Sequence, residues 1–336
     1  MKAAILGTGS WGTAFGRHLA NTWSQVTLWG IETDQIKSIN EQHTNPAFFG
    51  DLTLPANLDA TEDLATCLDG ADAIFTVLPS QVVRTVAQQI KTTAPDSTAP
   101  VISLSKGFEL SSLKRLSTVL EEEINGPEAK HRRAIGVLLG PSHAEEVVRG
   151  MPTAVVLAGT GTGWHDWQPH LSGPTFRVYT NHDMVGVEIA SAFKNVIAIA
   201  VGLCDGLKFG DNARGAVMTR GVNEMARLGV ALGGRYETFY GLAGIGDMIT
   251  TCTSQHSRNR NYGEAVATGK EDPQSLLSHA SQVVEGAVMT QAALKLCTKH
   301  SIELPITQEV HHVLFSGKCP QQAMRDLMER SLRHED

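Results

Sequence analysis

The chain has 336 residues, of which 42% are hydrophobic and 19% charged, and its net charge is −7. This length predicts two domains, and the composition is that of a globular protein with a substantial core. The negative charge disfavours a general nucleic-acid or anionic-membrane surface. Any anionic ligand must therefore bind at a local basic site.

The five cysteines are widely spaced, without a C-x-x-C motif or metal-type spacing. We therefore expect free thiols in a reducing compartment and no metal site. A predicted strand that begins near Lys2 leaves no room for a signal peptide. Glu188, Lys194 and Asp205 interrupt the longest apolar stretch, which disfavours a membrane span. These features predict a soluble, cytoplasmic protein without membrane insertion.

The first 180 residues alternate short apolar or β-branched runs with helical patterns, which predicts a doubly wound parallel α/β sheet of the Rossmann type. Strands are expected at residues 3–6, 26–29, 73–78, 101–105, 135–139, 154–158 and 177–179, with helical stretches at 82–90 and 113–124. Beyond residue 180, Ala, Leu and Met at helical spacing dominate. We therefore expect a dinucleotide-binding domain over residues 1–180 and an all-helical substrate domain over residues 181–336.

Gly7, Gly9 and Gly12 match the pattern G-x-G-x-x-G between a predicted strand and a helical stretch over residues 11–20. The first glycine permits a tight turn, the second lets the backbone approach a pyrophosphate, and the third lets helix and strand pack closely. The helix N-terminus then presents free N–H groups to the phosphates. A plain glycine-rich turn is the alternative, and the context disfavours it.

An acidic residue that binds the ribose is expected about 20 residues further on, at the end of the second strand. Glu32 lies there, although it is equally compatible with the start of a helix, where acidic residues are favoured. Ile31 precedes it, and no neighbouring Arg or His is present to meet a 2′-phosphate.

Lys194 lies in the apolar run 189–204, where the only other polar residues are Ser191 and Asn195. A helix that is apolar nearly all round is a buried helix. A buried lysine needs a partner because desolvating an ammonium is costly. Burial also lowers the pKa of a lysine, which suits it to proton transfer near neutral pH. A snorkelling or salt-bridged core lysine is the structural alternative.

Four further segments gather polar residues, and three of them also contain glycine. Lys106 follows the apolar run 101–104, at the edge where open α/β sheets bind ligands. Residues 140–144 (GPSHA) follow the next strand, and residues 244–251 (GIGDMITT) place a carboxylate after a flexible turn. Residues 257–261 (SRNRN) gather guanidinium, amide and hydroxyl donors, a set that favours a dianion.

Each of these segments has a structural alternative. Lys106 is also compatible with a solvated loop, Ser142 and Asp247 with helix caps, and Arg258 with an exposed surface charge. In combination with the glycine pattern and Lys194, these alternatives are jointly disfavoured.

From Lys2 to about Lys318 the chain resembles the bacterial NAD(P)-dependent glycerol-3-phosphate dehydrogenases. The matching stretches include GTGSWGTA, LPSQ, SLSKGFE, LLGPSHAEEV, SAFKNVIAIAVGLCDGL, GDNARGAVMTRGVNEMARLG, GLAGIGDMITTCTSQHSRNRNYG and VVEG. Several are long and rare, so the similarity is more specific than a shared Rossmann fold. The resemblance implies a C-terminal domain like that of 6-phosphogluconate dehydrogenase and the cofactor NAD(H) and/or NADP(H). It also implies a homodimer that reversibly reduces dihydroxyacetone phosphate to sn-glycerol 3-phosphate for phospholipid synthesis.

The resemblance further implies the residues of the site. Lys194 is the expected proton donor and acceptor, with Asn195 beside it, and Lys106 and Asp247 are the other expected catalytic residues. The expected substrate-binding residues are Lys106, Gly140, Ser142, Lys194, Asp247, Ser257, Arg258 and Asn259. The expected cofactor-binding residues, the three pattern glycines included, are Gly7, Gly9, Ser10, Trp11, Gly12, Lys106, Ala144, Arg258, Val283 and Glu285. Thr251 falls where eukaryotic relatives have an active-site threonine.

Two positions depart from the family pattern. Ile31 stands where members often have Arg or His, which disfavours a strong NADPH preference, and His143 stands where Phe is common. Two other functions compete with this assignment. A β-hydroxyacid or sugar-acid dehydrogenase of the same two-domain plan would need a carboxylate anchor instead of the cluster at 257–261. A non-catalytic dinucleotide sensor would have no reason to keep a buried ammonium and its partners.

Overall fold

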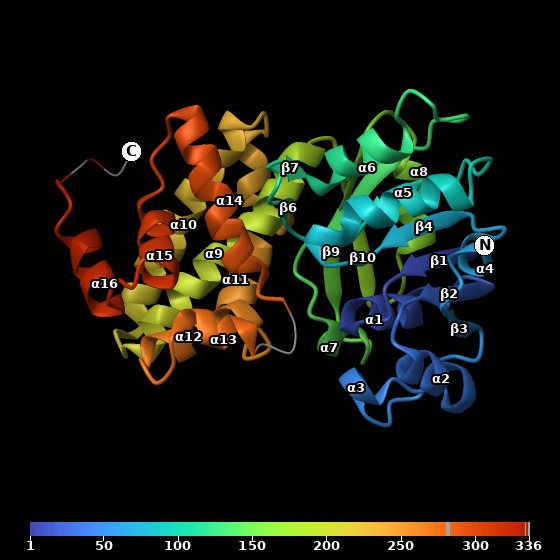
Figure 1. Ribbon diagram of the computed structural model, residues 1–336, viewed down its shortest axis with the longest axis horizontal. Coiled ribbons are helices and arrows are strands. Elements are labelled where there is room, and N and C mark those ends of the chain that lie inside the picture. Colours follow the sequence, from blue (N-terminus) through green and yellow to red (C-terminus); the bar gives the residue numbers. More distant parts are fainter. Residues whose placement is uncertain (280–282, 333, 335–336) are drawn as a thin grey trace. The chain divides into compact units, whose positions relative to one another are not determined.

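The computed structural model describes residues 1–279, 283–332 and 334. The chain divides into two compact units (Figure 1). The N-terminal unit comprises Met1–Glu109 and Lys114–Glu188, and the helical unit comprises Leu110–Leu113 and Ile189–Asp336.

An eight-stranded sheet forms the centre of the N-terminal unit, in the order β10-β9-β8-β5-β4-β1-β2-β3. Its strands are β1 (Lys2–Leu6), β2 (Gln25–Trp29), β3 (Leu58–Thr61), β4 (Ala73–Thr76), β5 (Val101–Ser103), β8 (Ile135–Leu139), β9 (Thr153–Gly159) and β10 (Phe176–Asn181). All seven predicted strands are present, with shifted ends. The sequence patterns had not indicated the edge strand β3 or the hairpin of β6 (Phe108–Glu109) and β7 (Lys114–Arg115).

The predicted Rossmann-type sheet is confirmed, with a reversal at one end. The six neighbouring strands β3, β2, β1, β4, β5 and β8 are parallel to one another. Strand β9 pairs with β8 in the antiparallel direction, and β10 pairs with β9 in parallel. The segment between β8 and β9 contains only a four-residue helix, α7 (Ala144–Val147). Parallel strands are usually joined through a full crossover helix, which this connection lacks, and the chain turns back here instead.

Helices cover both faces of this sheet because strand residues alternate between the faces. Ala3 and Ile5 belong to one apolar cluster, and Ala4 and Leu6 belong to the other. The helices of the unit are α1 (Ser10–Leu19), α2 (Thr33–Gln42), α3 (Pro46–Phe49), α4 (Leu64–Leu68), α5 (Val83–Thr93), α6 (Leu116–Ile124), α7 and α8 (Trp164–Leu171). Helices α1, α2, α7 and α8 contribute to the first cluster, and α4, α5 and α6 contribute to the second.

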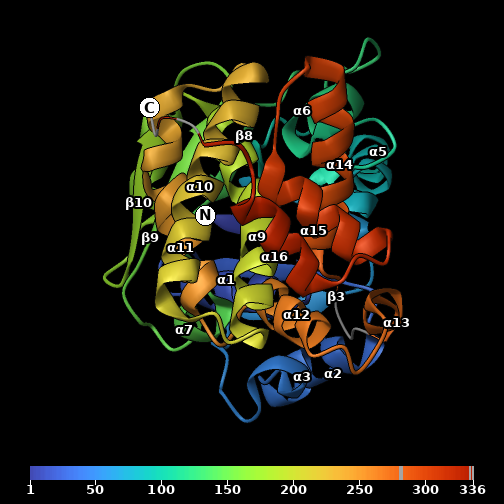
Figure 2. The same cartoon turned by 90° about the vertical axis from the view of Figure 1, so that its left-hand side faces the viewer.

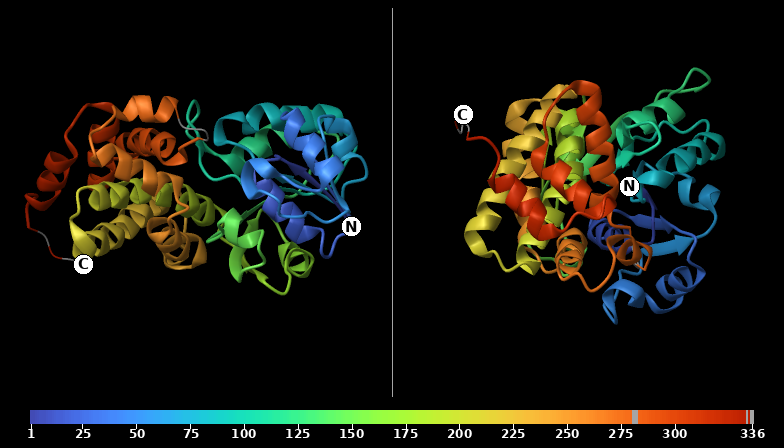
Figure 3. Two further views of the ribbon diagram at one scale, coloured as in Figure 1. Left: turned by 90° about the horizontal axis from the view of Figure 1, so that it is seen from below. Right: turned by 60° about the vertical axis from the view of Figure 1, so that its left-hand side comes forward.

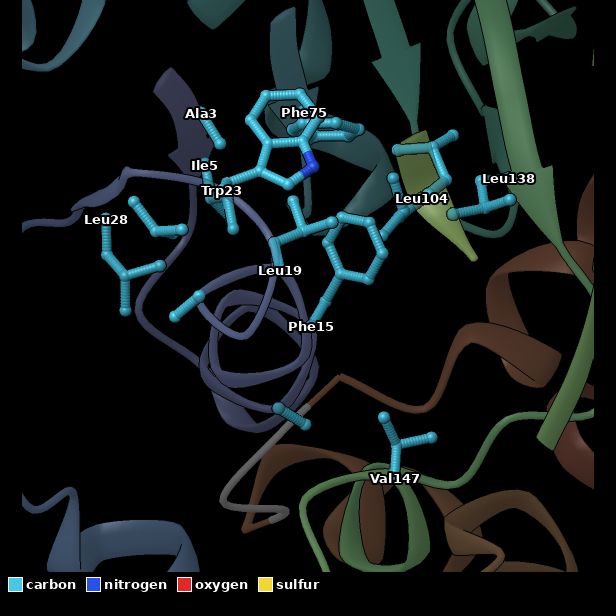
Figure 4. Packing of buried hydrophobic residues seen from close by; sticks show 14 of the residues in the cluster. Ala3, Ile5, Phe15, Leu19, Trp23, Leu28, Phe75, Leu104, Leu138 and Val147 are labelled. Carbon is cyan, nitrogen blue, oxygen red and sulfur yellow. The ribbon is translucent and has the colours of Figure 1, made fainter. Parts of the chain in front are cut away.

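Aromatic side chains fix α1 on the sheet (Figure 4). Phe15 of α1 meets Phe75 of β4 edge to face, with ring centroids 5.1 Å apart, and Trp23 meets the same ring at 5.9 Å. Such pairs add to the burial free energy of the rings. This packing fixes the start of α1 directly after the carboxyl end of β1.

The helical unit is organised around α9 (Met184–Gly206), which begins in the N-terminal unit. The other helices are α10 (Gly210–Ala231), α11 (Asp247–Thr253), α12 (Arg258–Ala267), α13 (Pro273–Ser278), α14 (Glu285–His300), α15 (Pro305–Phe315) and α16 (Pro320–Met328). Figures 2 and 3 show these helices gathered around α9. Every regular element described for this unit is helical, as predicted.

Helix α9 has a mean hydropathy of 1.7 and is long and apolar enough to cross a membrane. Its most apolar 18-residue stretch, however, is 100% buried inside the protein. It is therefore a core helix. Helix α12 packs closely on it, because a Cβ atom at Gly263 would lie 2.2 Å from the Ile199 carbonyl oxygen. A Cβ atom at Gly202 would likewise lie 2.0 Å from the Arg260 carbonyl oxygen. Glycine at both positions lets the start of α12 lie beside the middle of α9.

Candidate active site

The glycine pattern forms the turn from β1 into α1. Gly7 has φ of +140°, and a Cβ atom there would lie 2.4 Å from the Val77 carbonyl oxygen. A Cβ atom at Gly12 would lie 2.0 Å from the Gly7 carbonyl oxygen, whereas one at Gly9 would meet nothing within 4 Å. Gly7 and Gly12 are thus required for the turn and the close packing, and Gly9 borders open space that a ligand can approach.

Helix α1 leaves its first N–H groups for a ligand. Its N-cap residue, Gly9, makes no side-chain cap, and its first turn contains no acidic residue. Ser10 is its first residue, and Trp11 is half-buried, with its ring centroid 6.0 Å from that of Phe15. An uncapped helix N-terminus with its positive dipole end is a site for an anion such as a pyrophosphate.

Ile31 and Glu32 follow the carboxyl end of β2, as predicted. Ile31 is 77% exposed. Glu32 is exposed and is the N-cap residue of α2, but its side chain makes no capping hydrogen bond. Glu32 therefore does begin a helix, the alternative that the sequence left open, and its exposed carboxylate makes no capping hydrogen bond.

Lys106, Gly140 and Ser142 lie together after β5 and β8. The Gly140 carbonyl accepts from Lys106 Nζ at 3.1 Å and from Ser142 Oγ at 3.0 Å. Lys106 is half-buried and hence not a freely solvated loop residue. His143, not Ser142, is the N-cap of α7, and Ala144 is the first residue of that helix. The alternative that Ser142 caps a helix is therefore wrong, because its hydroxyl bonds back to the turn.

Lys194 lies in the middle of α9, and its side chain is 6% exposed. Its ammonium forms an ion pair with the Asp247 carboxylate and donates to Thr251 Oγ1 at 2.6 Å. Thr251 Oγ1 donates in turn to the Asp247 carbonyl at 2.7 Å, and Ser191 Oγ lies 3.5 Å from Asp247 Oδ2. These bonds compensate the desolvation of both charges and fix the ammonium in one position.

Asp247 is the first residue of α11, after the π-helical turn η3 (Leu242–Gly246). It is 1% exposed and pairs with Lys194, and Gly246, not Asp247, is the N-cap residue. A carboxylate in the first turn is also favoured by the helix dipole. The buried Cys252 thiol lies beside the pair, and burial raises its pKa to about 12, so it stays a thiol.

The cluster at 257–261 surrounds the start of α12. Ser257 is the N-cap, and its Oγ accepts from the Arg260 N–H at 3.3 Å. Asn259 Nδ2 donates to Asn195 Oδ1 at 3.0 Å, and the Gly286 N–H donates to Asn259 Oδ1 at 2.9 Å. These amides join α12, α9 and α14 directly next to Lys194.

The two arginines of this cluster have different surroundings. Arg258 is exposed, and its Nη1 donates to the Val283 carbonyl at 3.2 Å. Arg260 is held by Asp205 of α9, with its Nε and Nη2 each 2.7 Å from Oδ2. Arg260 thus ties α12 to α9, whereas Arg258 is placed to reach a ligand. Glu285, half-buried, begins α14.

Three contributors to these groups had no prior sequence assignment: the Ser191 hydroxyl, the Gly286 N–H and the Val283 carbonyl as a hydrogen-bond acceptor. The first is a small polar residue in an apolar run, and the others are backbone groups without a sequence signal. Within residues 1–279, 283–332 and 334, no group of three or more His, Cys, Asp or Glu residues could hold a metal ion. All five cysteines are free thiols.

Comparison with known proteins assigns the family. The family model for the N-terminus of NAD-dependent glycerol-3-phosphate dehydrogenase matches residues 2–163, and the model for its C-terminus matches residues 183–325. A glycerol-3-phosphate dehydrogenase [NAD(P)+] of an Exiguobacterium species is 43% identical over 99% of this chain and 97% of its own. One of Pelotomaculum thermopropionicum is 44% identical over 99% and 95%.

A solved structure agrees with these sequence matches. The crystal structure of glycerol-3-phosphate dehydrogenase from Coxiella burnetii superposes with a TM-score of 0.91 at 39% identity, over 98% of this chain and 99% of that chain. The two family models together span most of the chain, and the relatives match it almost end to end. The chain therefore belongs to the NAD-dependent glycerol-3-phosphate dehydrogenase family.

Proposed function

We propose that this protein reversibly reduces dihydroxyacetone phosphate to sn-glycerol 3-phosphate with NADH or NADPH. The observation that carries this proposal is the buried ammonium of Lys194, held by Asp247 and Thr251 beside the amide of Asn195. Family membership supports the same reaction. A sensor would not need this costly buried charge, because a salt bridge out of water rarely adds stability.

The turn after β1 fits a dinucleotide. Gly7 and Gly12 leave no room for side chains, Gly9 borders open space, and the α1 N-terminus is uncapped. Gly9, Ser10 and Trp11 would hold the cofactor at this turn. The family resemblance implies further cofactor contacts from Lys106, Ala144, Arg258, Val283 and Glu285. When bound, the cofactor supplies or accepts the hydride at the substrate C2.

Lys194 delivers a proton to the carbonyl oxygen of the substrate as charge develops there. Asp247 and Thr251 engage the Lys194 ammonium and hold it in one position. The family resemblance further implies that the positive charge of Lys106 stabilises the developing alkoxide. In the oxidation direction the Lys194 amine takes the proton back.

The start of α12 binds the substrate phosphate. Arg258 offers an exposed guanidinium, Asn259 offers an amide, and Ser257 keeps its hydroxyl hydrogen because its oxygen accepts from Arg260. The helix N-terminus adds a positive dipole end. Binding the phosphate orients C2 and lowers the entropic cost of the reaction. Gly140 and Ser142 complete the proposed substrate contacts.

Cofactor preference and cellular setting are part of this proposal. Ile31 offers no charge to a 2′-phosphate, so NADH is used at least comparably to NADPH. The enzyme is a homodimer in the cytoplasm, and its product provides the glycerol phosphate backbone of phospholipids.

A substrate test decides between the proposed reaction and its competitors. NADH absorbance is followed with dihydroxyacetone phosphate, and in parallel with β-keto acids and sugar-acid carbonyl compounds at equal concentration. We expect oxidation of NADH with dihydroxyacetone phosphate alone. Turnover of the acidic compounds instead would assign a hydroxyacid dehydrogenase, and cofactor binding without any turnover would assign a sensor.

A further inference from the structure

A buried asparagine lies beneath the glycine turn, on a segment without any sequence signal for function. Asn45 is 0% exposed and lies between α2 and α3. Its Nδ2 donates to the Thr8 carbonyl at 3.0 Å and to Thr13 Oγ1 at 2.9 Å. Thr13 Oγ1 also donates to the Thr8 carbonyl, at 3.1 Å. Asn45, which lies 37 and 32 positions from Thr8 and Thr13, thus closes one small hydrogen-bonded ring with these two residues.

The direction of every bond in this ring is fixed. The Thr8 carbonyl can only accept, so the Thr13 hydroxyl hydrogen is used on it and the Thr13 oxygen is left to accept. The Asn45 group that faces both acceptors must therefore be the NH2 group. The ring has no alternative pattern in which the amide is flipped and the same contacts survive.

The ring also sets the direction of the Gly9 N–H. The Thr8 carbonyl and the Gly9 N–H belong to one planar trans peptide unit, so they point in opposite directions. Two donors hold the carbonyl toward the buried Asn45 and Thr13. The Gly9 N–H therefore points away from the interior, on the residue that borders open space before α1.

We propose that Asn45, acting with Thr13, is a positioning residue that aims the Gly9 N–H at the pyrophosphate of the dinucleotide. This inference rests on the proposed function, because it requires that the turn binds NADH. Because folding already orders the Thr8–Gly9 peptide unit, cofactor binding does not have to pay the entropic cost of ordering it, and affinity rises. The backbone of Asn45 separately accepts from the Phe48 and Phe49 N–H groups, so a side-chain substitution leaves the start of α3 bonded.

The test measures NADH affinity by calorimetry with the full chain and, without cofactor, hydrogen exchange of residues 7–13. The variants are Asn45→Ala, Thr13→Val and the hydroxyl-retaining Thr13→Ser. Asn57→Ala is the matched control, because Asn57 Nδ2 also donates to two carbonyls of this unit, those of Ala20 and Trp23, both at 2.9 Å. Each of Asn45→Ala and Thr13→Val removes one of the two donors to the Thr8 carbonyl, which predicts about a tenfold rise in Kd.

We expect faster exchange at residues 7–13 in Asn45→Ala and Thr13→Val, and near wild-type affinity in Thr13→Ser and Asn57→Ala. The KM for dihydroxyacetone phosphate should stay unchanged in all four. Wild-type affinity and exchange in Asn45→Ala, or an equal loss in Asn57→Ala, would overturn the inference. If Asn45→Ala does not fold, the contrast between Thr13→Val and Thr13→Ser decides. Absence of NADH binding in the wild type would instead overturn the proposed function.

Discussion

Replacing Asp247 by Asn should destabilise the helical unit strongly, because the substitution leaves the Lys194 ammonium buried without a counter-charge. The two side chains are 6% and 2% exposed, so water cannot replace the lost partner. Breaking a pair this deeply buried costs about 3–5 kcal/mol. Thr251 still accepts from Lys194 at 2.6 Å, which favours the lower end, about 3 kcal/mol.

Removing the ammonium as well should restore much of this loss. In Lys194→Met with Asp247→Asn no buried charge remains, and burying an uncharged amide costs far less than burying an unpaired charge. We therefore expect the double variant to be at least about 2 kcal/mol more stable than Asp247→Asn alone. Asp247→Asn and the double variant should both lose activity, whereas only the double variant should regain stability, so the loss of activity cannot be ascribed to unfolding alone.

Urea unfolding followed by circular dichroism measures these differences, with separate fits if the two units unfold in separate transitions. Glu303→Gln is the control, because Glu303 pairs with Arg330 at the surface at 3.4 Å and with 64% of its side chain exposed. An exposed pair is worth about 0–1 kcal/mol. A loss below about 1 kcal/mol for Asp247→Asn, or a double variant less stable than Asp247→Asn, would refute the reasoning.

Three further predictions follow from other parts of the molecule. Arg258→Ala should raise the KM for dihydroxyacetone phosphate at least about tenfold, because a charge-assisted bond is lost. Arg260→Ala breaks the ion pair with Asp205 of α9 and should chiefly lower stability. An unchanged KM in steady-state kinetics of Arg258→Ala would contradict this prediction. Ile31→Arg, at a 77% exposed position, should shift the kcat/KM ratio about tenfold toward NADPH; a wild-type preference for NADPH above about tenfold would show that another basic residue reads the 2′-phosphate. Burial lowers the pKa of His18 below 6.5, against a smaller opposite effect of its bond to Leu171. The unfolded chain therefore takes up the proton first, and the free energy of unfolding should fall as pH drops below about 6.5. His18→Asn should lose less stability than the wild type between pH 7 and 5, and an equal pH dependence of the unfolding free energy in both proteins would show that His18 is not its cause.

Local patterns predicted the elements of the fold well where one residue type dominates. The glycine turn and α1 were expected because Gly7 and Gly12 meet steric demands that no other residue satisfies. The strand β3 was not expected, because a strand of only four residues carries too little pattern. The reversal at β9 was not expected, because the strand patterns give no indication of a strand's direction.

The site was predictable as a set of residues but not as a set of contacts. An apolar helix implied a partner for Lys194, yet Asp247 lies 53 positions away and only the fold joins them. Resemblance to the family alone distinguished Arg258 from Arg260, and the ion pair of Arg260 to Asp205 gives the physical difference. Asn45 gave no signal, because an asparagine before a proline is typical of an ordinary turn. Its contacts to Thr8 and Thr13 exist only in three dimensions.

The most direct test of the account is single-turnover reduction of dihydroxyacetone phosphate by Lys194→Ala with NADH already bound. If Lys194 is the proton donor, we expect intact NADH affinity and a hydride-transfer rate about 10²–10⁴-fold below wild type, the usual contribution of a general acid. A variant that folds, binds NADH and keeps more than about a tenth of the wild-type rate would show that the proton comes from another group.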